Sequence, residues 1–369
     1  MDRVALDCQK ESQLIEHRIR FSKDENYEVP VYNTPIPPVE NFKLMLDGKI
    51  PFWMPSDSDT LSIIPRILPD NVARGYVLEA EPLAPEENGG VDMFGVDWVF
   101  VPSVGGSMVK PGNPKLADIC DWKKVITFPN LDDYDWEGSA VKNAPILEKN
   151  RDKFIETWIF NGLFERLISF LDFEGAALAL LDEEQQEAVH ELFDRLCILY
   201  DDLIGRLQKY YGVHFVTFHD DWGSQRAPFF SLETCREMIA PYLKRVVESC
   251  HKRGLYFNFH SCGKNEMLVP AMIEAGIDMW IPQTMNDFDM LVREYGDKLC
   301  LGLRLAELPP TATDEEISAA AASYIERSKG CTRVFTSGAL FARSNPAMAK
   351  LLREIYFQSR EAYNKLAAN

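Results

Sequence analysis

The sequence is poor in positive charge and has no long hydrophobic run. Its 369 residues include 39 lysines and arginines against 57 aspartates and glutamates, which gives a net charge of −18. A surface of that sign repels nucleic acid and anionic membranes, so neither is expected as a partner. No apolar stretch approaches the length that spans a bilayer, and the chain is charged from its second residue, with Asp2 and Arg3 after Met1. We therefore expect a cytoplasmic protein.

Two kinds of short motif are also missing. The eight cysteines include no C-x-x-C pair and have no regular spacing. A chain of this length can bury a core without disulfides, so this usage is typical of a reducing compartment. The sequence has neither G-x-G-x-x-G nor G-x-x-x-x-G-K-[ST], which removes the main support for a nucleotide-binding open sheet.

Apolar runs typical of buried strands alternate with segments of helical spacing through the C-terminal two-thirds. The expected strands are 154–160, 213–219, 255–259, 278–282, 299–305 and 332–336. The expected helices are 185–210, 232–253, 266–275, 287–295, 314–328 and 346–366. This alternation predicts parallel strands joined by crossover helices. Because the strands are apolar almost throughout, both faces of the sheet should be covered.

Two further apolar runs, 49–54 and 96–101, bring the expected strands to eight. Eight such units over this length predict a (β/α)8 TIM barrel, with a doubly wound open sheet as the alternative. Residues 46–369 are expected to form the barrel, with proline- and glycine-rich insertions between 61 and 150. Residues 1–45 are expected to form an N-terminal extension, a helical arm that ends in the proline-rich segment 35–38.

The predicted strand 255–259 leads directly into His260 and Cys262. Residues two apart on a strand point to the same side, so these two side chains should face the same way. At the carboxyl end of a barrel strand, where active sites lie, an imidazole and a thiolate could bind one zinc ion. The alternative is a core histidine beside a buried, inert cysteine.

The preceding strand ends in His219, Asp220 and Asp221. Two adjacent carboxylates cannot point the same way. One could face the barrel mouth as a metal ligand, a general base or a substrate anchor, while the other caps a helix or pairs with a cation. Both could instead be loop caps, because aspartate favours turns and helix N-termini. His219 itself is expected to be a core histidine.

Other polar and aromatic side chains lie near the predicted strand ends. Tryptophans in such positions suit a flat, apolar or methylated substrate. The candidates for substrate binding are Trp53, Trp158, Trp222, Gln283 and Arg304, and Glu307 is a candidate metal ligand.

Several motifs together resemble the uroporphyrinogen decarboxylase superfamily over roughly residues 45–369. They are D-D-W-G-S-Q at 220–225, P at 228 with S-L-E at 231–233, P-Y at 241–242, H-x-C-G at 260–263, E-A-G-I-D at 274–278 and Y-G-D at 295–297. The resemblance implies a (β/α)8 barrel. The true decarboxylases carry R-Q-A-G-R after the first strand, where arginines bind substrate carboxylates. Here residues 51–59 read P-F-W-M-P-S-D-S-D, and an acidic segment would repel a polycarboxylate.

The other branch, the zinc-dependent corrinoid-linked methyltransferases, has an H-x-C pair and a later cysteine as zinc ligands. His260 and Cys262 match the pair, but residues 337–340 contain no cysteine. The third ligand could be Asp220, Asp221 or Glu307, and the alternative is a metal site that is weakened or lost. The segments 92–98 and 106–112 look similar to the subgroup that handles methoxylated aromatics.

The resemblance implies an enzyme that moves a methyl group from an O-methyl donor to the cob(I)alamin of a partner corrinoid protein. Zinc would act as a Lewis acid, and Asp220 or Asp221 would complete the site or protonate the leaving oxygen. A decarboxylase or lyase, a methyl-corrinoid:thiol methyltransferase and a non-catalytic binding protein remain as alternatives. A homodimer is left open.

Overall fold

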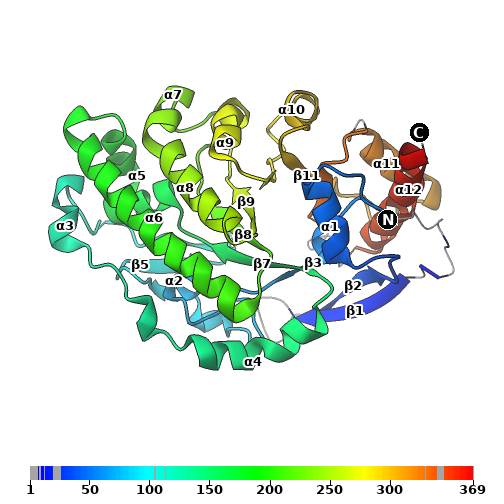
Figure 1. Ribbon diagram of the computed structural model, residues 1–369, viewed down its shortest axis with the longest axis horizontal. Helices are drawn as coiled ribbons and strands as arrows, with labels where there is room; N and C mark the ends of the chain where they lie inside the picture. Colours follow the sequence, from blue (N-terminus) through cyan, green and yellow to red (C-terminus); the bar gives the residue numbers. More distant parts are fainter. Residues whose placement is uncertain are drawn as a thin grey trace.

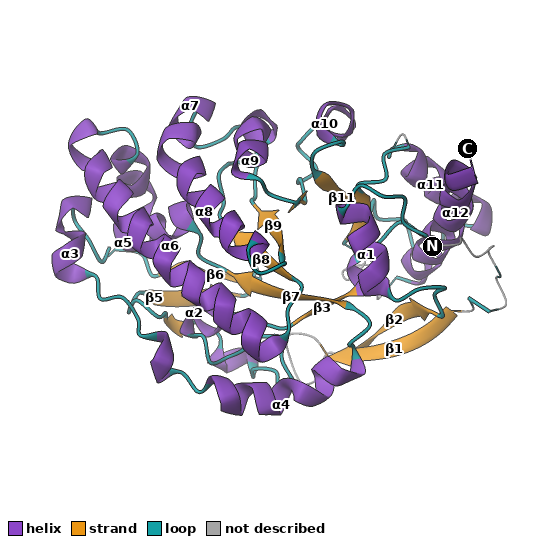
Figure 2. Cartoon of the chain, in the orientation of Figure 1, coloured by secondary structure: helices purple, strands orange, loops and turns teal. Residues whose placement is uncertain are grey.

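A curved, parallel sheet forms the centre of the molecule, and helices cover it (Figures 1 and 2). The computed structural model describes residues 7, 10–11, 13–19 and 26–368, with gaps at 104, 113, 329 and 339–344. The order of the seven strands in the sheet is β12-β11-β10-β9-β8-β7-β3. They are β3 (Thr60–Ser62), β7 (Phe154–Ile159), β8 (Phe215–His219), β9 (Tyr256–His260), β10 (Met279–Trp280), β11 (Cys300–Arg304) and β12 (Val334–Ser337).

The two edges of this sheet are joined by one short segment. The backbone N–H of Thr336 in β12 donates to the carbonyl of Pro55 at 2.7 Å, and Ser56 forms a parallel bridge to Thr336. A few residues later β3 pairs with β7 at the opposite edge. Residues 55–62 therefore close the sheet on itself, and the predicted TIM-barrel type of α/β fold is confirmed.

Helices follow the strands in the expected alternation. The main ones are α5 (Leu163–Ala179), α6 (Glu183–Tyr211), α8 (Ala240–His251), α9 (Val269–Ala275), α10 (Phe288–Tyr295), α11 (Asp314–Glu326) and α12 (Pro346–Ala368). The shorter or more peripheral ones are α1 (Pro38–Leu46), α2 (Pro69–Ala73), α3 (Trp122–Val125), α4 (Trp136–Lys149) and α7 (Leu232–Thr234). Within the described part of the chain, none of these helices is both long and apolar enough to cross a membrane.

The longest helix, α6, shows why the sequence folds this way. Asp182 caps its first turn by accepting a hydrogen bond from the backbone N–H of Glu184. The buried residues Leu192, Leu196 and Leu203 recur at helical spacing on the face that packs inward. The helix ends at Gly212, which adopts the left-handed conformation (φ 62°) that favours glycine.

The strands and helices predicted from residue 154 onward are all present, with ends within two residues of the predicted bounds. The helix predicted over 232–253 contains one π turn at Cys235–Ile239, and α5 was not predicted.

Both strands predicted before residue 150 are wrong as barrel strands. Residues 49–54 form no strand, and the barrel instead uses the bridge at Ser56 and the short β3. The run 96–101 does form a strand, β5 (Asp97–Val101), but in a separate antiparallel sheet with β4 (Gly90–Val91) and β6 (Gly106–Val109). Trp98 is buried whereas Val99 is 43% exposed, so β5 is half-buried, unlike a central barrel strand.

The expected helical arm is also wrong for most of its length. Strands β1 (Gln13–Ile19) and β2 (Asn26–Tyr32) form an antiparallel ribbon, and only α1 is helical. The alternation in N-Y-E-V-P-V-Y is typical of a strand. The segment is anchored to α12, because the buried Arg360 donates to Glu11 at 2.7 Å and the hydroxyl of Tyr356 donates to Glu11 at 2.5 Å. No observation tests the boundary expected at residue 45.

A buried arginine attaches the insertion to the barrel. Arg166 of α5 is 1% exposed and pairs with Asp70 of α2 and, at 2.5 Å, with Asp92. Asp92 also accepts hydrogen bonds from the backbone N–H groups of Phe94 and Val96. Residues 92–96, just before β5, therefore form a turn around Asp92, a counter-ion of Arg166.

We predict that Arg166→Met destabilises the protein by about 3–5 kcal/mol, because it leaves two buried carboxylates without their cation. Chemical denaturation with urea measures the change. Arg293→Met is the matched control, since the side chain of Arg293 is 59% exposed and, among the described residues, its ion pair is with its neighbour Glu294. Equal unfolding midpoints for the two variants would contradict the anchoring role of Arg166.

Candidate functional site

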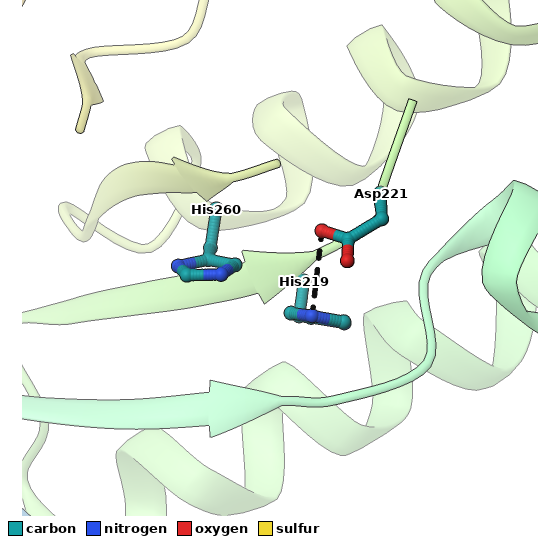
Figure 3. Close-up of side chains that lie close together, drawn as sticks. All are labelled: His219, Asp221 and His260. Carbon is teal, nitrogen blue, oxygen red and sulfur yellow. Dashed lines mark ion pairs between the residues drawn. The ribbon is translucent and has the colours of Figure 1, made fainter. Parts of the chain in front are cut away.

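Two histidines lie side by side at the carboxyl ends of neighbouring barrel strands. His219 ends β8 and His260 ends β9, and the two residues are direct partners in the parallel register. Their rings are stacked with centroids 4.9 Å apart and planes 22° apart. Figure 3 shows both imidazoles turned to the same space, with Asp221 above His219.

Asp221 completes a group of three potential metal ligands. Its Oδ1 lies 3.5 Å from Nε2 of His219. One ligand atom from each of His219, Asp221 and His260 lies within 4.8 Å of the other two, the only such histidine, cysteine and carboxylate group in the described ranges. Tetrahedral ligands about 2.0–2.3 Å from one ion lie roughly 3.3–3.8 Å apart, and the 3.5 Å between His219 and Asp221 falls in this range.

A backbone hydrogen bond sets the tautomer of His219. Its Nδ1 lies 2.9 Å from the carbonyl oxygen of Phe160, which can only accept, so we assign the ring proton to Nδ1. A guanidinium nitrogen of Arg74 lies 3.4 Å from the same Nδ1. Because a guanidinium can only donate, the two contacts compete for this nitrogen, and the shorter one, to Phe160, decides where the ring proton is placed. The lone pair on Nε2 then faces Asp221, as a metal ligand requires.

The protonation states of the other two groups suit the same role. Burial lowers the pKa of His260 to about 3, with a further contribution from His219. Burial alone would raise the pKa of Asp221, but His219, His260 and the N–H of Cys262 outweigh it, and the pKa lies below its usual range. A neutral imidazole and an ionised carboxylate are the forms that bind metal ions.

Two glycines bring the loops of the site together. The backbone N–H of Cys262 donates to Oδ1 of Asp221 at 2.6 Å, so the loop after β9 holds the carboxylate. Gly263 has φ +104°, and a Cβ on it would lie 2.3 Å from the backbone of Gly223. The glycines of the H-x-C-G and D-D-W-G motifs are therefore required for this close approach.

Asp220 points away from the histidines. One of its oxygens accepts from the backbone N–H of Glu165 at 2.7 Å, in the first turn of α5, and the other accepts from Nε1 of Trp222 at 2.9 Å. Burial raises the pKa of Asp220 to about 7, and its side chain packs against Gly162, where a Cβ would lie only 2.5 Å away. Asp220 caps a helix and does not line the cavity, so its expected catalytic role has no support in this geometry.

The cluster opens into a cavity of about 380 Å³ inside the barrel. Trp158 and Arg304, two of the predicted substrate-binding residues, line it, and so does Cys262. The Sγ of Cys262 lies 3.6 Å from Nε2 of His260, and burial raises the pKa of this thiol to about 12. Cys262 thus adjoins the group of three without belonging to it, and its role as a ligand stays a prediction.

The other predicted site residues lie elsewhere. Trp53 is buried against Tyr356, and Trp222 is buried against Phe259. Gln283 accepts from the backbone N–H of Gly263 and so supports the loop rather than the cavity wall. Glu307 is exposed in the irregular segment after β11 and does not belong to the group of three.

His219 is the member of the cluster that the sequence-based prediction assigned to the core. A usable signal was present, because β8 ends in Thr217-Phe-His219 and β9 ends in Asn258-Phe-His260. Equivalent endings on consecutive parallel strands place both histidines at one level and on one face.

Comparison with known proteins agrees with the fold. Residues 174–346, a little under half of the chain, match the family model for uroporphyrinogen decarboxylase (URO-D). A methyltransferase from Methanosarcina mazei has a similar structure, with a TM-score of 0.59 and 14% identity over 89% of this chain and 99% of that one. The Old Yellow Enzyme from Pichia sp. AKU4542 gives a TM-score of 0.38 and 13% identity over 59% of this chain and 67% of that one. The search of curated proteins gave no match.

We predict that His219→Ala, Asp221→Ala and His260→Ala each weaken zinc binding at least about 100-fold, since loss of even a supporting outer-shell partner typically costs 10–100-fold. Competition titration with a chromophoric chelator measures the affinity. His190→Ala is the matched control, because His190 bonds to Tyr242 on the outer helices.

Cys262→Ser separates the two ligand sets in the same titration. A loss smaller than about tenfold agrees with the group of three. Unchanged affinity in His219→Ala together with a large loss in Cys262→Ser would contradict it.

Proposed function

We propose that the protein is a zinc-dependent methyltransferase of the uroporphyrinogen decarboxylase superfamily. Its reaction transfers a methyl group from a methoxylated aromatic compound to cob(I)alamin carried by a partner corrinoid protein. The observation that carries this proposal is the group His219, Asp221 and His260 at the mouth of a cavity with aromatic walls.

The donor set fits zinc. Two imidazoles and one carboxylate are a common set in catalytic zinc sites, which leave a further position for substrate. The hydrogen bond from His219 to Phe160 supplies the outer contact that orients such a ligand. Bound zinc would act as a Lewis acid on the ether oxygen, which otherwise departs as an anion and is a poor leaving group.

The aromatic wall suits a flat donor. Tyr76 stacks on Phe160 with centroids 5.1 Å apart, and Phe160 stacks on Trp158 at 5.2 Å. Trp158 in turn lies 5.3 Å from the ring of His260. A benzene ring packed along this row would have its substituent held beside the cluster, which supplies the positioning that an in-line transfer needs.

Arg304 can stabilise charge on the leaving group. It lies at the end of β11, lines the cavity and makes no ion pair within the described residues. A cation beside the forming phenolate stabilises the transition state more than the neutral ether. This assigns to Arg304 an electrostatic role and not only a binding role.

The decarboxylase alternative fits the cavity less well. Asp57 and Glu156 both line it, and Asp221 adjoins His219 on its wall. Arg74 and Arg304 line it too, but Arg74 pairs with Glu165, so Arg304 alone would have to hold a substrate with several carboxylates against these acids.

The test is the formation of methylcobalamin, followed by absorbance. Zinc-loaded protein is incubated with 4-methoxyphenol and excess free cob(I)alamin. We expect the wild-type protein to form methylcobalamin at least about 100-fold faster than His260→Ala, because loss of a Lewis acid costs several kcal/mol. His190→Ala is the control and should keep the wild-type rate.

Equal rates for wild type and His260→Ala would contradict the proposal. In a second reaction, methylcobalamin is offered with a thiol. Zinc-dependent loss of its methyl group there, without any reaction of the ether, would replace the proposal by the methyl-corrinoid:thiol alternative.

A further inference from the structure

A row of hydrogen-bonding side chains crosses the barrel interior below the metal-ligand group. Glu156 of β7 accepts from the hydroxyls of Ser62 and Thr217, each at 2.5 Å. The hydroxyl of Thr217 in turn lies 3.0 Å from Nδ2 of Asn258. Glu156, Ser62 and Asn258 line the cavity, on three strands of the barrel.

The donors and acceptors of this row can be assigned one by one. Burial raises the pKa of Glu156, and the hydrogen bonds from Ser62 and Thr217 act against that rise. The ionised form is the one that accepts from both hydroxyls, and both contacts have the length of O–H···O⁻ bonds. Thr217 has one hydroxyl proton, which goes to Glu156, so its oxygen accepts from the amide of Asn258. This fixes the amide orientation and leaves Oδ1 of Asn258 as the outer end of the row.

That oxygen has no donor. Asn258 is only 4% exposed, and no group of the described residues donates to its Oδ1. Buried acceptors are rarely left unpaired, because the lost hydration is not replaced. Since Asn258 lines the cavity, a molecule bound there is the natural source of the missing donor.

We propose that Asn258 determines specificity by accepting a hydrogen bond from a hydroxyl group of the bound substrate. The acceptor is a neutral amide, and the neighbouring Glu156 already accepts from two hydroxyls, so the site suits a neutral donor rather than a cation. Resting on the methyltransferase function proposed above, this makes the substrate class a methoxylated phenol.

The position of Asn258 also fixes where the hydroxyl must be. Asn258 and His260 face the same side of β9 two residues apart, which is about 6.6 Å because a parallel strand rises roughly 3.3 Å per residue. That separation is of the same order as the distance between the two oxygens of a benzene ring whose hydroxyl lies opposite its methoxy group. The methoxy group would then lie at the cluster and the hydroxyl at Asn258.

The experiment compares two ligands of nearly equal shape, 4-methoxyphenol and 4-methoxytoluene, with the zinc-loaded full chain. Dissociation constants come from quenching of tryptophan fluorescence, checked by calorimetry. Wild-type protein should bind the phenol about tenfold more tightly, the upper range for one net hydrogen bond. In Asn258→Leu the ratio should fall to about one, because the acceptor is gone.

Asn150→Leu is the matched control, since it makes the same change at a buried asparagine outside the cavity, and it should keep the wild-type ratio. If Asn258→Leu does not fold, Asn258→Ala serves in its place. A wild-type ratio of one, or an unchanged ratio in the folded Asn258 variant, would overturn the proposal.

The outcome is separable from that of the proposed function. Discrimination by Asn258 without any methylcobalamin formation would leave the recognition intact and reject the methyltransferase reaction. If both ethers bind equally and form methylcobalamin at equal rates, the methyltransferase reaction is supported and recognition by Asn258 is rejected.

Discussion

The parallel register between β8 and β9 is the constraint on which the site depends. It pairs His219 with His260, and so places two imidazoles at one level of the barrel mouth. The same register pairs Thr217 with Asn258 one layer below, where the polar row crosses the interior. A shift of one residue in either strand would turn one histidine outward and one apolar side chain into the cavity. The hydrogen bonding between these two strands therefore determines which side chains meet at the barrel mouth.

The surroundings of the two histidines convert this placement into a group that can bind a metal ion. Phe160 accepts the Nδ1 proton of His219, and Cys262 holds Asp221 through its backbone N–H. The two adjacent aspartates have different roles: Asp221 faces the histidines, and Asp220 caps α5. The same helix carries Arg166, whose two buried ion pairs hold the insertion over the barrel. Helix α5 therefore holds both the loop that carries the two aspartates, through Asp220, and the insertion, through Arg166.

The barrel was predictable from residue 154 onward because strand and helix periodicities there are local and strong. Upstream, the half-buried β5 resembled a barrel strand in composition, and the closing contact at Ser56 involves too few residues to leave a pattern. In the site, His260 and Asp221 could be found from motifs at strand ends. His219 could not be separated from a core histidine without the register, and Trp53 and Trp222 are packed in the core. The position of the family's later cysteine falls within 337–340, of which 339 and 340 lie outside the described residues.

The central claim is that His219, Asp221 and His260 hold one catalytic metal ion. X-ray absorption at the zinc edge of the loaded wild-type protein tests it most directly, because imidazole, carboxylate and thiolate ligands scatter differently. We expect a first shell of nitrogen and oxygen at about 2.0–2.2 Å with the outer scattering of two imidazoles. A shell dominated by sulfur at about 2.3 Å, or one with no more than a single imidazole, would contradict it.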